Sequence, residues 1–135
     1  MSPIRPRQRS TTSASSASSA LASSTVAAEV PSKYKSKTLK VAADATYAPN
    51  EFIAPDGHTV IGMDADLVRA LGTVMGLKVN IIDSNFETII PGLAAGRYDV
   101  GMSSFTDTKE REKTVDFVNY FKAGITFYAK SSTNV

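Results

Sequence analysis

The pattern of apolar residues predicts strands that alternate with helices from about residue 38 onward. Short, largely apolar runs at 39–43, 77–82 and 98–102 have the length of buried strands. Between the first two runs, apolar residues recur at the spacing of one helix face, namely at Leu67, Ala70, Leu71, Val74 and Met75. This spacing predicts a helix that Asp64 caps and that ends at Gly76.

A second helix is predicted between the second and third strands. Ser84 and Glu87 have the spacing of a capping box ahead of another apolar stripe. Pro91 places the regular start of this helix near Thr88, because proline fits only the first turn of a helix. Gly96 is expected to end it.

A hairpin and two later segments complete the expected strands. A turn at 55–57, with the sequence Pro-Asp-Gly, separates apolar runs at 52–53 and 59–61. Further strands are expected at 117–118 and 125–129. Because strands and helices alternate, the sequence predicts an α/β fold with a mainly parallel sheet and right-handed crossovers.

Three polar segments each follow a predicted strand, and these are Asp44–Tyr47, Ser84–Phe86 and Ser103–Arg111. In open parallel sheets, ligands bind beyond the carboxyl ends of the strands. We therefore expect these segments to meet at one edge of the sheet and to form a ligand site.

The segment after the third strand has chemistry suited to a small carboxylate. The hydroxyl-rich loop 103–106 leads to Asp107 or Thr108, either of which can cap a following helical turn that contains Arg111. A guanidinium offers a planar, bidentate fork to a carboxylate, and free backbone amides add donors. A capped turn with a solvated arginine would show the same pattern, so the sequence leaves both interpretations open.

Three further residues have two interpretations each. Tyr47 and Phe86 can be core residues or ring walls beside a ligand, and the position of Tyr47 before a proline favours the wall. Asp44 can cap a turn or meet a cationic or polar group of the ligand.

The first part of the chain differs in composition from the rest. Residues 1–37 form a basic leader, rich in serine and alanine, that we expect to be disordered, and residues 38–135 form the folded part. Arginines followed by a small-residue segment resemble a secretory signal, but serines interrupt its apolar region, so a disordered leader or a misassigned start stays open. Residues 1–40 carry a net charge of +6 and the remainder −4, which argues against nucleic-acid binding by the folded part.

Several other chemistries have little support. The chain has no cysteine, which excludes disulfides, thiol catalysis and a lipoprotein anchor cysteine. It has no glycine-rich phosphate-binding motif. His58, the only histidine, lies in the predicted hairpin turn, so the sequence does not favour a Ser-His-Asp catalytic triad. Asp64 and Asp66 are explained by helix capping and the helix dipole rather than by a metal.

Four segments carry a resemblance to a known family. They are DATYAP (44–49), GMDADL (62–67), SNFETIIPGLAAGRYDVGMSSFTDTKERE (84–112) and VDFVNYF (115–121). In these motifs and their order, residues 39–130 resemble the amino-acid-binding members of the bacterial extracellular solute-binding proteins. The resemblance implies a periplasmic-binding-protein-like α/β lobe, a polar or charged amino acid as ligand, no enzymatic activity and no cofactor.

The resemblance also implies roles for individual residues. It suggests that Arg111 clamps the ligand α-carboxylate together with Thr106. Ser104, and less strongly Ser103, resemble contacts to the α-ammonium group. Tyr47 and Phe86 resemble aromatic walls, and Asp44 resembles a position that selects the ligand side chain. Neither a metal ligand nor a catalytic residue is implied.

The resemblance further implies partners and a location. The expected partners are an amino-acid ligand and the membrane subunits of an ABC importer, and the expected location is the periplasm or the cell surface. We expect the chain to be truncated before the second lobe of the family, so that it supplies a half-receptor with weakened binding. Apolar surface left exposed in this way would favour self-association.

Two alternatives stay open from the sequence alone. An enzyme on the same scaffold, such as a dehydratase of a small carboxylate, would need an acid or base beside Arg111, and Asp44 is the most plausible residue for that role. A truncated product that binds nothing is the other alternative.

Overall fold

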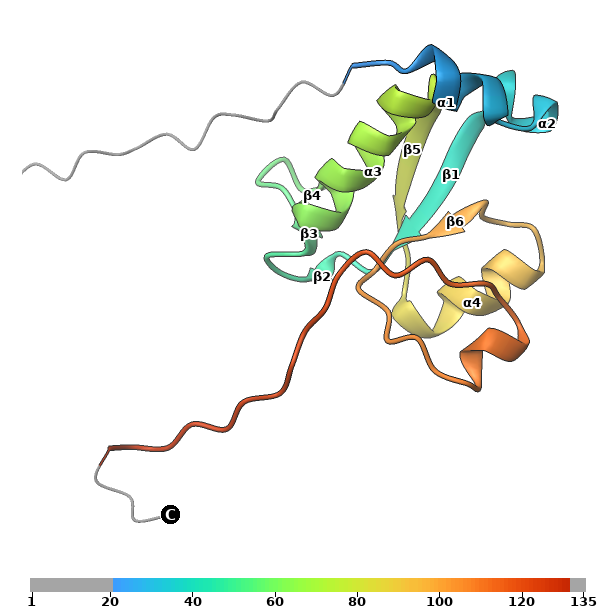
Figure 1. Cartoon of the computed structure of the whole chain (residues 1–135). Coiled ribbons are helices and arrows are strands. Elements are labelled where there is room, and N and C mark those ends of the chain that lie inside the picture. Colours follow the sequence, from blue (N-terminus) through green and yellow to red (C-terminus); the bar gives the residue numbers. More distant parts are fainter. Residues whose placement is uncertain (1–20, 132–135) are drawn as a thin grey trace, which may run out of the picture.

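Three parallel strands form the central sheet of the computed structural model, which describes residues 21–131 (Figure 1). The strand order is β5-β1-β6, with β1 at Thr38–Ala43, β5 at Lys78–Asp83 and β6 at Val100–Gly101. Val41 of the central strand pairs with Ile81 on one side and Val100 on the other. The structure thus confirms the predicted parallel sheet and α/β fold, although β6 is shorter than the apolar run suggested.

The first predicted helix is α3, Met63–Met75, which packs beside β5. Its buried face meets the sheet through a core cluster of Leu39, Val41, Val68 and Met102. Gly76 ends the helix with φ of 67°, which confirms the prediction of a glycine C-terminus. The prediction that Asp64 caps this helix is wrong, because Gly62 occupies the N-cap and the side chain of Asp64 is turned to the loop after β6.

The second predicted helix is α4, Phe86–Ala94, and its start was placed too late. Asn85 rather than Ser84 is the N-cap, and its side chain accepts from the amide of Glu87. The amide of Phe86 donates to the carboxylate of Asp44. Because side chains satisfy these first amides, the helix begins at Phe86 and carries Pro91 inside it.

The predicted hairpin is confirmed within a second, antiparallel sheet. Its strands are β2 (Thr46–Tyr47), β3 (Glu51–Ile53) and β4 (Val60–Ile61), in the order β2-β3-β4. In the turn, the Asp56 carboxylate accepts from the amides of His58 and Thr59. This small sheet lies beside α3, close to where the central strands end (Figure 1).

The segment before β1 contains two short helices that the sequence did not predict. These helices are α1, Ser24–Glu29, and α2, Ser32–Lys35. The amide of Ser23 donates to the carbonyl of Val74 at 3.1 Å, and Val30 is buried, so α1 packs on the end of α3. The predicted leader is thus structured within residues 24–35, while its residues 1–20 lie outside the described part of the chain.

The segment after Arg111 differs from the sequence prediction. A 3₁₀ turn, η1 at Arg111–Lys113, is present, but neither 117–118 nor 125–129 forms a strand. Residues 122–131 extend away from the domain (Figure 1), where no neighbouring strand offers backbone partners. The strand predictions for these two segments are therefore wrong. Within residues 21–131, no helix combines the length and the apolar character needed to cross a membrane.

Candidate functional site

The three polar segments meet at the carboxyl ends of the central strands, as the sequence predicted. Asp44 follows β1, Phe86 follows β5, and Ser103 follows β6. The carboxylate of Asp44 accepts from the amide of Phe86 at 2.9 Å, and the amide of Asp44 donates to the Ser103 hydroxyl at 2.9 Å. Asp44 therefore ties all three strand ends together.

Arg111 lies over an aromatic surface beside this junction. Its guanidinium carbon is 5.3 Å from the ring centroid of Phe86 and 5.4 Å from that of Phe105. The two rings stack on each other with centroids 4.3 Å apart. Cation–π attraction to both rings orients the guanidinium.

A backbone contact fixes one end of the guanidinium. Its Nη1 donates to the carbonyl oxygen of Thr106 at 2.8 Å, and the amide of Arg111 donates to the Thr108 hydroxyl, although Glu110 rather than Asp107 or Thr108 is the N-cap of the turn. Arg111 is half-exposed, and none of the ion pairs among residues 21–131 includes it. The Arg111 guanidinium thus faces solvent, and its remaining N–H groups are available as donors beside the exposed Thr106.

Ser103 is buried, and its hydroxyl both accepts and donates a hydrogen bond within the protein. It accepts from the amide of Asp44 and donates to Oε1 of Glu51 at 2.8 Å. Ser103 is only 3% exposed, so its side chain supports the junction from beneath.

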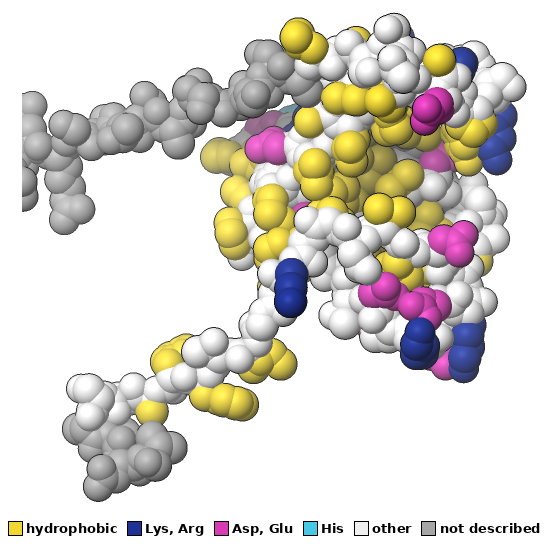
Figure 2. All heavy atoms as spheres, viewed as in Figure 1, with side chains coloured by type: hydrophobic (Ala, Val, Ile, Leu, Met, Phe, Trp, Pro, Cys, Tyr) yellow, Lys and Arg dark blue, Asp and Glu magenta, His cyan; other side chains and the backbone are white. Residues whose placement is uncertain are grey.

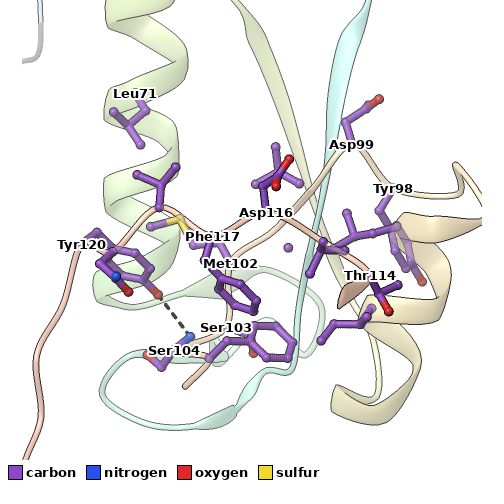
Figure 3. A pocket seen from close by; sticks show the side chains of 18 of the residues that line it. Leu71, Tyr98, Asp99, Met102, Ser103, Ser104, Thr114, Asp116, Phe117 and Tyr120 are labelled. Carbon is purple, nitrogen blue, oxygen red and sulfur yellow. Dashed lines mark hydrogen bonds between the residues drawn. The ribbon is translucent and has the colours of Figure 1, made fainter. Parts of the chain in front are cut away.

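Ser104 is held by a polar network in a left-handed conformation, with φ of 44°. Its amide and hydroxyl both donate to Oδ2 of Asp64, at 2.9 and 3.1 Å, and the hydroxyl accepts from the Asn50 amide group at 2.7 Å. The amide also lies 3.1 Å from the Tyr120 hydroxyl, the contact drawn in Figure 3. These bonds offset the cost of the unfavourable backbone conformation.

Two side chains of this network have shifted pKa values. Burial, with the neighbouring carboxylates of Asp64 and Asp44 adding to it, raises the pKa of Glu51 to about 7, although the hydrogen bond from Ser103 acts in the opposite direction. Burial and the carboxylate of Asp64 raise the pKa of Tyr120 to about 12. Tyr120 is therefore neutral at physiological pH.

Tyr47 is not brought against the other predicted site residues. It lies in β2, three residues beyond Asp44, and its side chain is 61% exposed. Of the seven predicted residues, Asp44, Phe86, Ser103, Thr106 and Arg111 form one connected chain of contacts, and Ser104 adjoins it.

Four residues of this region were not among those predicted from the sequence. Glu51, Asn50 and Phe105 were not singled out, and Asp64 was assigned only to helix capping. Phe105 could have been found, since it is the one apolar residue inside the hydroxyl-rich loop. For Glu51 and Asn50 the sequence offers only their place at the start of a hairpin strand.

A hollow adjoins the site, because Ser103, Ser104 and Phe105 form part of its lining. It has a volume of about 650 Å³ and lies between α3, α4 and the segment 114–121. Its lining is mostly apolar and includes Leu67, Leu71, Ile90, Leu93, Met102 and Phe117. Figure 2 shows apolar side chains over this face and along the C-terminal segment, and Figure 3 shows the hollow from close by. Such a lining does not suit a zwitterionic ligand, and Arg111 does not contribute to it.

The described side chains were also compared with the requirements of a metal site. Within residues 21–131, no group of three or more histidine, cysteine, aspartate or glutamate side chains is arranged to hold a metal ion.

The protein is similar to proteins named for the amino acids that they bind. It is 40% identical over 87 residues to the arginine-binding protein ArgT of Corynebacterium glutamicum, covering 64% of this chain and 28% of that protein. It is 31% identical over 100 residues to the L-arginine-binding protein of Pseudomonas aeruginosa, covering 73% of this chain and 38% of that protein. The chain thus spans about a third of the length of these curated relatives.

Solved structures give the same fold. The arginine-bound Phe57Trp mutant of domain 1 from TmArgBP matches with a TM-score of 0.61 at 35% identity, covering 64% of this chain and 67% of that one. An ancestral arginine-binding protein bound to arginine matches with a TM-score of 0.57 at 40% identity, covering 59% of this chain and 35% of that one. The family model described as bacterial extracellular solute-binding proteins, family 3, matches residues 39–135. Since this match spans most of the chain, the protein belongs to family 3 of the bacterial extracellular solute-binding proteins.

Proposed function

We propose that this chain supplies the carboxylate-binding part of an amino-acid receptor and that Arg111 binds the ligand α-carboxylate. The observation that carries the proposal is the state of the Arg111 guanidinium. It is half-exposed, held by the carbonyl of Thr106 and by two aromatic rings, and is in no ion pair within the described residues. An oriented, unneutralised guanidinium binds a carboxylate at little further entropic cost.

The other predicted residues take roles around this anchor. The exposed Thr106 adds its hydroxyl and amide as donors to the same carboxylate. Phe86 forms one wall of the site, and Tyr47, which is exposed in β2, is the second wall in this proposal. Ser104 contributes to the α-ammonium subsite, and the buried Ser103 supports it from beneath.

We propose a cationic amino acid, with L-arginine as the first ligand to test. The relatives named above bind arginine by name. The side chain of such a ligand would stack on the Phe86 ring and meet the carboxylate of Asp44, which is half-buried at the same strand end. Aromatic faces and carboxylates are the groups that a guanidinium prefers.

A receptor of this kind would act outside the cytoplasm and deliver its ligand to the membrane subunits of an ABC importer. The family, which is described as extracellular solute-binding proteins, supports this location. Self-association through exposed apolar surface of the lobe stays a prediction.

An enzymatic function is the second candidate, because an ancestral cyclohexadienyl dehydratase matches with a TM-score of 0.59 at 32% identity, covering 63% of this chain and 35% of that one. Asp44 would be its acid or base. Both oxygens of Asp44 already accept bonds, one from the Phe86 amide and one from the Thr46 hydroxyl. This structural use of Asp44 favours binding without turnover, and an assay with prephenate-like acids separates the two functions.

The binding proposal is tested by calorimetry with two variants of the same turn. Arg111→Ala should weaken L-arginine binding by roughly 30-fold or more, since it leaves the ligand carboxylate without its charged partner. Lys113→Ala, which removes an exposed lysine two residues away, is the control and should change the affinity by less than about two-fold.

A second ligand, agmatine, tests whether Arg111 contacts the carboxylate of L-arginine. Agmatine keeps the guanidinium of arginine but lacks its carboxylate, so it should bind weakly and with the same affinity to both variants. Equal loss of L-arginine affinity in the two variants would contradict the assignment of Arg111.

A further inference from the structure

Two buried carboxyl groups hold the consecutive serines of the site loop. Oε1 of Glu51 accepts from the Ser103 hydroxyl at 2.8 Å. Oδ2 of Asp64 accepts from the amide and the hydroxyl of Ser104. The side chains of Glu51 and Asp64 are each 1% exposed, so the loop rests on two acids that are removed from water.

The second oxygen of each carboxyl group is buried without a partner. Within the described residues, Oε2 of Glu51 and Oδ1 of Asp64 have no hydrogen bond. The backbone joins the two residues closely, because the amide of Asp64 donates to the carbonyl of Asn50, next to Glu51, at 2.9 Å. Two ionised carboxylates in such a place would each be desolvated and would repel each other.

One proton resolves both difficulties. The side chains of Glu51 and Asp64 lie within hydrogen-bonding reach of each other, so a proton on one carboxyl group makes it a donor to the other, and the pair then carries a single negative charge. We propose that Glu51 and Asp64 share one proton across their two unpartnered oxygens, and that this protonated pair positions Ser103 and Ser104.

The charges around the pair favour the same arrangement. The groups that face it are the carboxylate of Asp44 and the hydroxyls of Ser103 and Tyr120. No ion pair among residues 21–131 includes either acid, so no cation there neutralises a second negative charge. The raised pKa of Glu51, about 7, agrees with a proton retained at neutral pH.

The consequence for the ligand rests on the proposed function. The loop held by the pair continues directly into Thr106 and Arg111. When the proton is lost above pH 7, the two carboxylates repel each other and release Ser103 and Ser104 from their fixed positions. Affinity for L-arginine should then fall between pH 6 and pH 9 in the wild-type chain.

The shared proton is tested first without any ligand. The carboxyl carbons of glutamate and aspartate side chains are labelled with ¹³C, and their NMR shifts are followed from pH 4 to pH 9. One carboxyl titration near pH 7 is expected in the wild type, and it should disappear in Glu51→Gln. If every carboxyl titrates below pH 5, the proposal is overturned. Because no ligand is present, this result is independent of whether the chain binds amino acids.

Amide variants test the geometry of the pair. In Glu51→Gln the side-chain oxygen can still accept from Ser103 while the NH₂ group donates to Asp64. In Asp64→Asn the oxygen can still accept from Ser104 while the NH₂ group donates to Glu51. Each single variant imitates the protonated pair and should fold, with the pH dependence of its melting temperature reduced between pH 5 and pH 8.

The double variant separates a shared proton from simple charge removal. It sets two NH₂ groups against each other, so it should lose more stability than the two single variants together. Additive effects, or an unchanged pH dependence in Glu51→Gln, would overturn the proposal. Glu87→Gln, at an exposed position of α4, is the control for loss of a carboxylate and should leave the pH dependence unchanged.

For the ligand, the affinity of Glu51→Gln for L-arginine should stay constant from pH 6 to pH 9, while that of the wild type falls. A parallel fall in both would overturn the positioning role. Absence of L-arginine binding in both the wild type and Glu51→Gln would instead contradict the proposed function. The NMR test of the shared proton would not be affected by that result.

Discussion

The ring of Phe105 stacks on the ring of Phe86, with centroids 4.3 Å apart and planes inclined by 23°. This pair joins the loop after β6 to the first turn of α4, and it forms the surface on which Arg111 lies. The orientation of the Arg111 guanidinium therefore depends on Phe105, which is not one of the predicted ligand-binding residues.

Replacing Phe105 should thus affect binding through Arg111. We expect Phe105→Leu to weaken L-arginine binding by about 5- to 10-fold, because one cation–π contact and one aromatic pair contribute roughly 1 kcal/mol. Calorimetry measures the effect, and Phe127→Leu is the control, since Phe127 is 94% exposed. If the two variants bind alike, Phe105 does not orient Arg111.

Gly62 should be the least replaceable glycine before α3. Its φ is 120°, and an added Cβ would lie 2.4 Å from the carbonyl oxygen of Asn50. Gly62→Ala should lower the free energy of unfolding by about 3 kcal/mol or more, through backbone strain and a clash with main chain. Gly57→Ala, with φ of 80° and open space around it, should cost only about 1–2 kcal/mol in the same urea titration. Similar losses in the two variants would contradict this reasoning.

Ser103→Ala should have two linked effects. It removes the acceptor of the Asp44 amide and the donor to Glu51, and it should lower the free energy of unfolding by about 1–3 kcal/mol. Because the Ser103 hydrogen bond lowers the pKa of Glu51, its loss should raise that pKa above about 7. Carboxyl NMR and urea unfolding measure the two effects.

Ser84→Ala is the matched control for Ser103→Ala. The Ser84 hydroxyl lies 2.9 Å from the Tyr98 hydroxyl, away from Glu51. Its removal should leave the titration of Glu51 unchanged. A Glu51 pKa that stays near 7 in Ser103→Ala would show that this hydroxyl does not act on the carboxyl group.

Asp99 should make the free energy of unfolding depend on pH in the acidic range. Partial burial acts to raise its pKa, but hydrogen bonds from the Lys37 ammonium and the Lys40 amide outweigh it and hold the pKa below its usual 3.8. The folded state therefore favours the ionised form, and its contribution is present above about pH 4 and is lost as the pH falls through the folded pKa.

Asp99→Asn should accordingly lower the free energy of unfolding by about 1 kcal/mol at pH 7 and by less at pH 3. Urea unfolding at both values measures the difference. Asp66→Asn is the control, because the side chain of Asp66 is 79% exposed in its contact with Arg69. A loss for Asp99→Asn that is equal at both pH values would contradict the assigned direction.

The sequence predicted those elements whose signal is local. β1, β5 and α3 follow from apolar runs and helical spacing, and the meeting of Asp44, Phe86 and Ser103 follows from the rule that ligand loops gather at the carboxyl ends of parallel strands. The start of α4 was missed because its first amide is satisfied by Asp44, which is distant in the sequence.

The support beneath the site could not be predicted for the same reason. Asp64 has the local pattern of a helix cap, and only the folded chain turns its carboxylate toward Ser104 and buries it near Glu51. The segments 117–118 and 125–129 have strand-like composition, but a strand also needs a neighbour with free backbone groups, and sequence pattern alone does not supply one.

The strand order β5-β1-β6 also governs how the chain can fold during its synthesis. β1 lies at the centre of the sheet and leaves the ribosome first, yet both of its partners come later in the chain. At about 5–20 residues per second, translation separates β1 from β6 by several seconds. Until β5 emerges the buried residues of β1 have no neighbouring strand, and until β6 emerges one edge of β1 stays unpaired, which makes the nascent chain a substrate for chaperones that hold unpaired apolar strands.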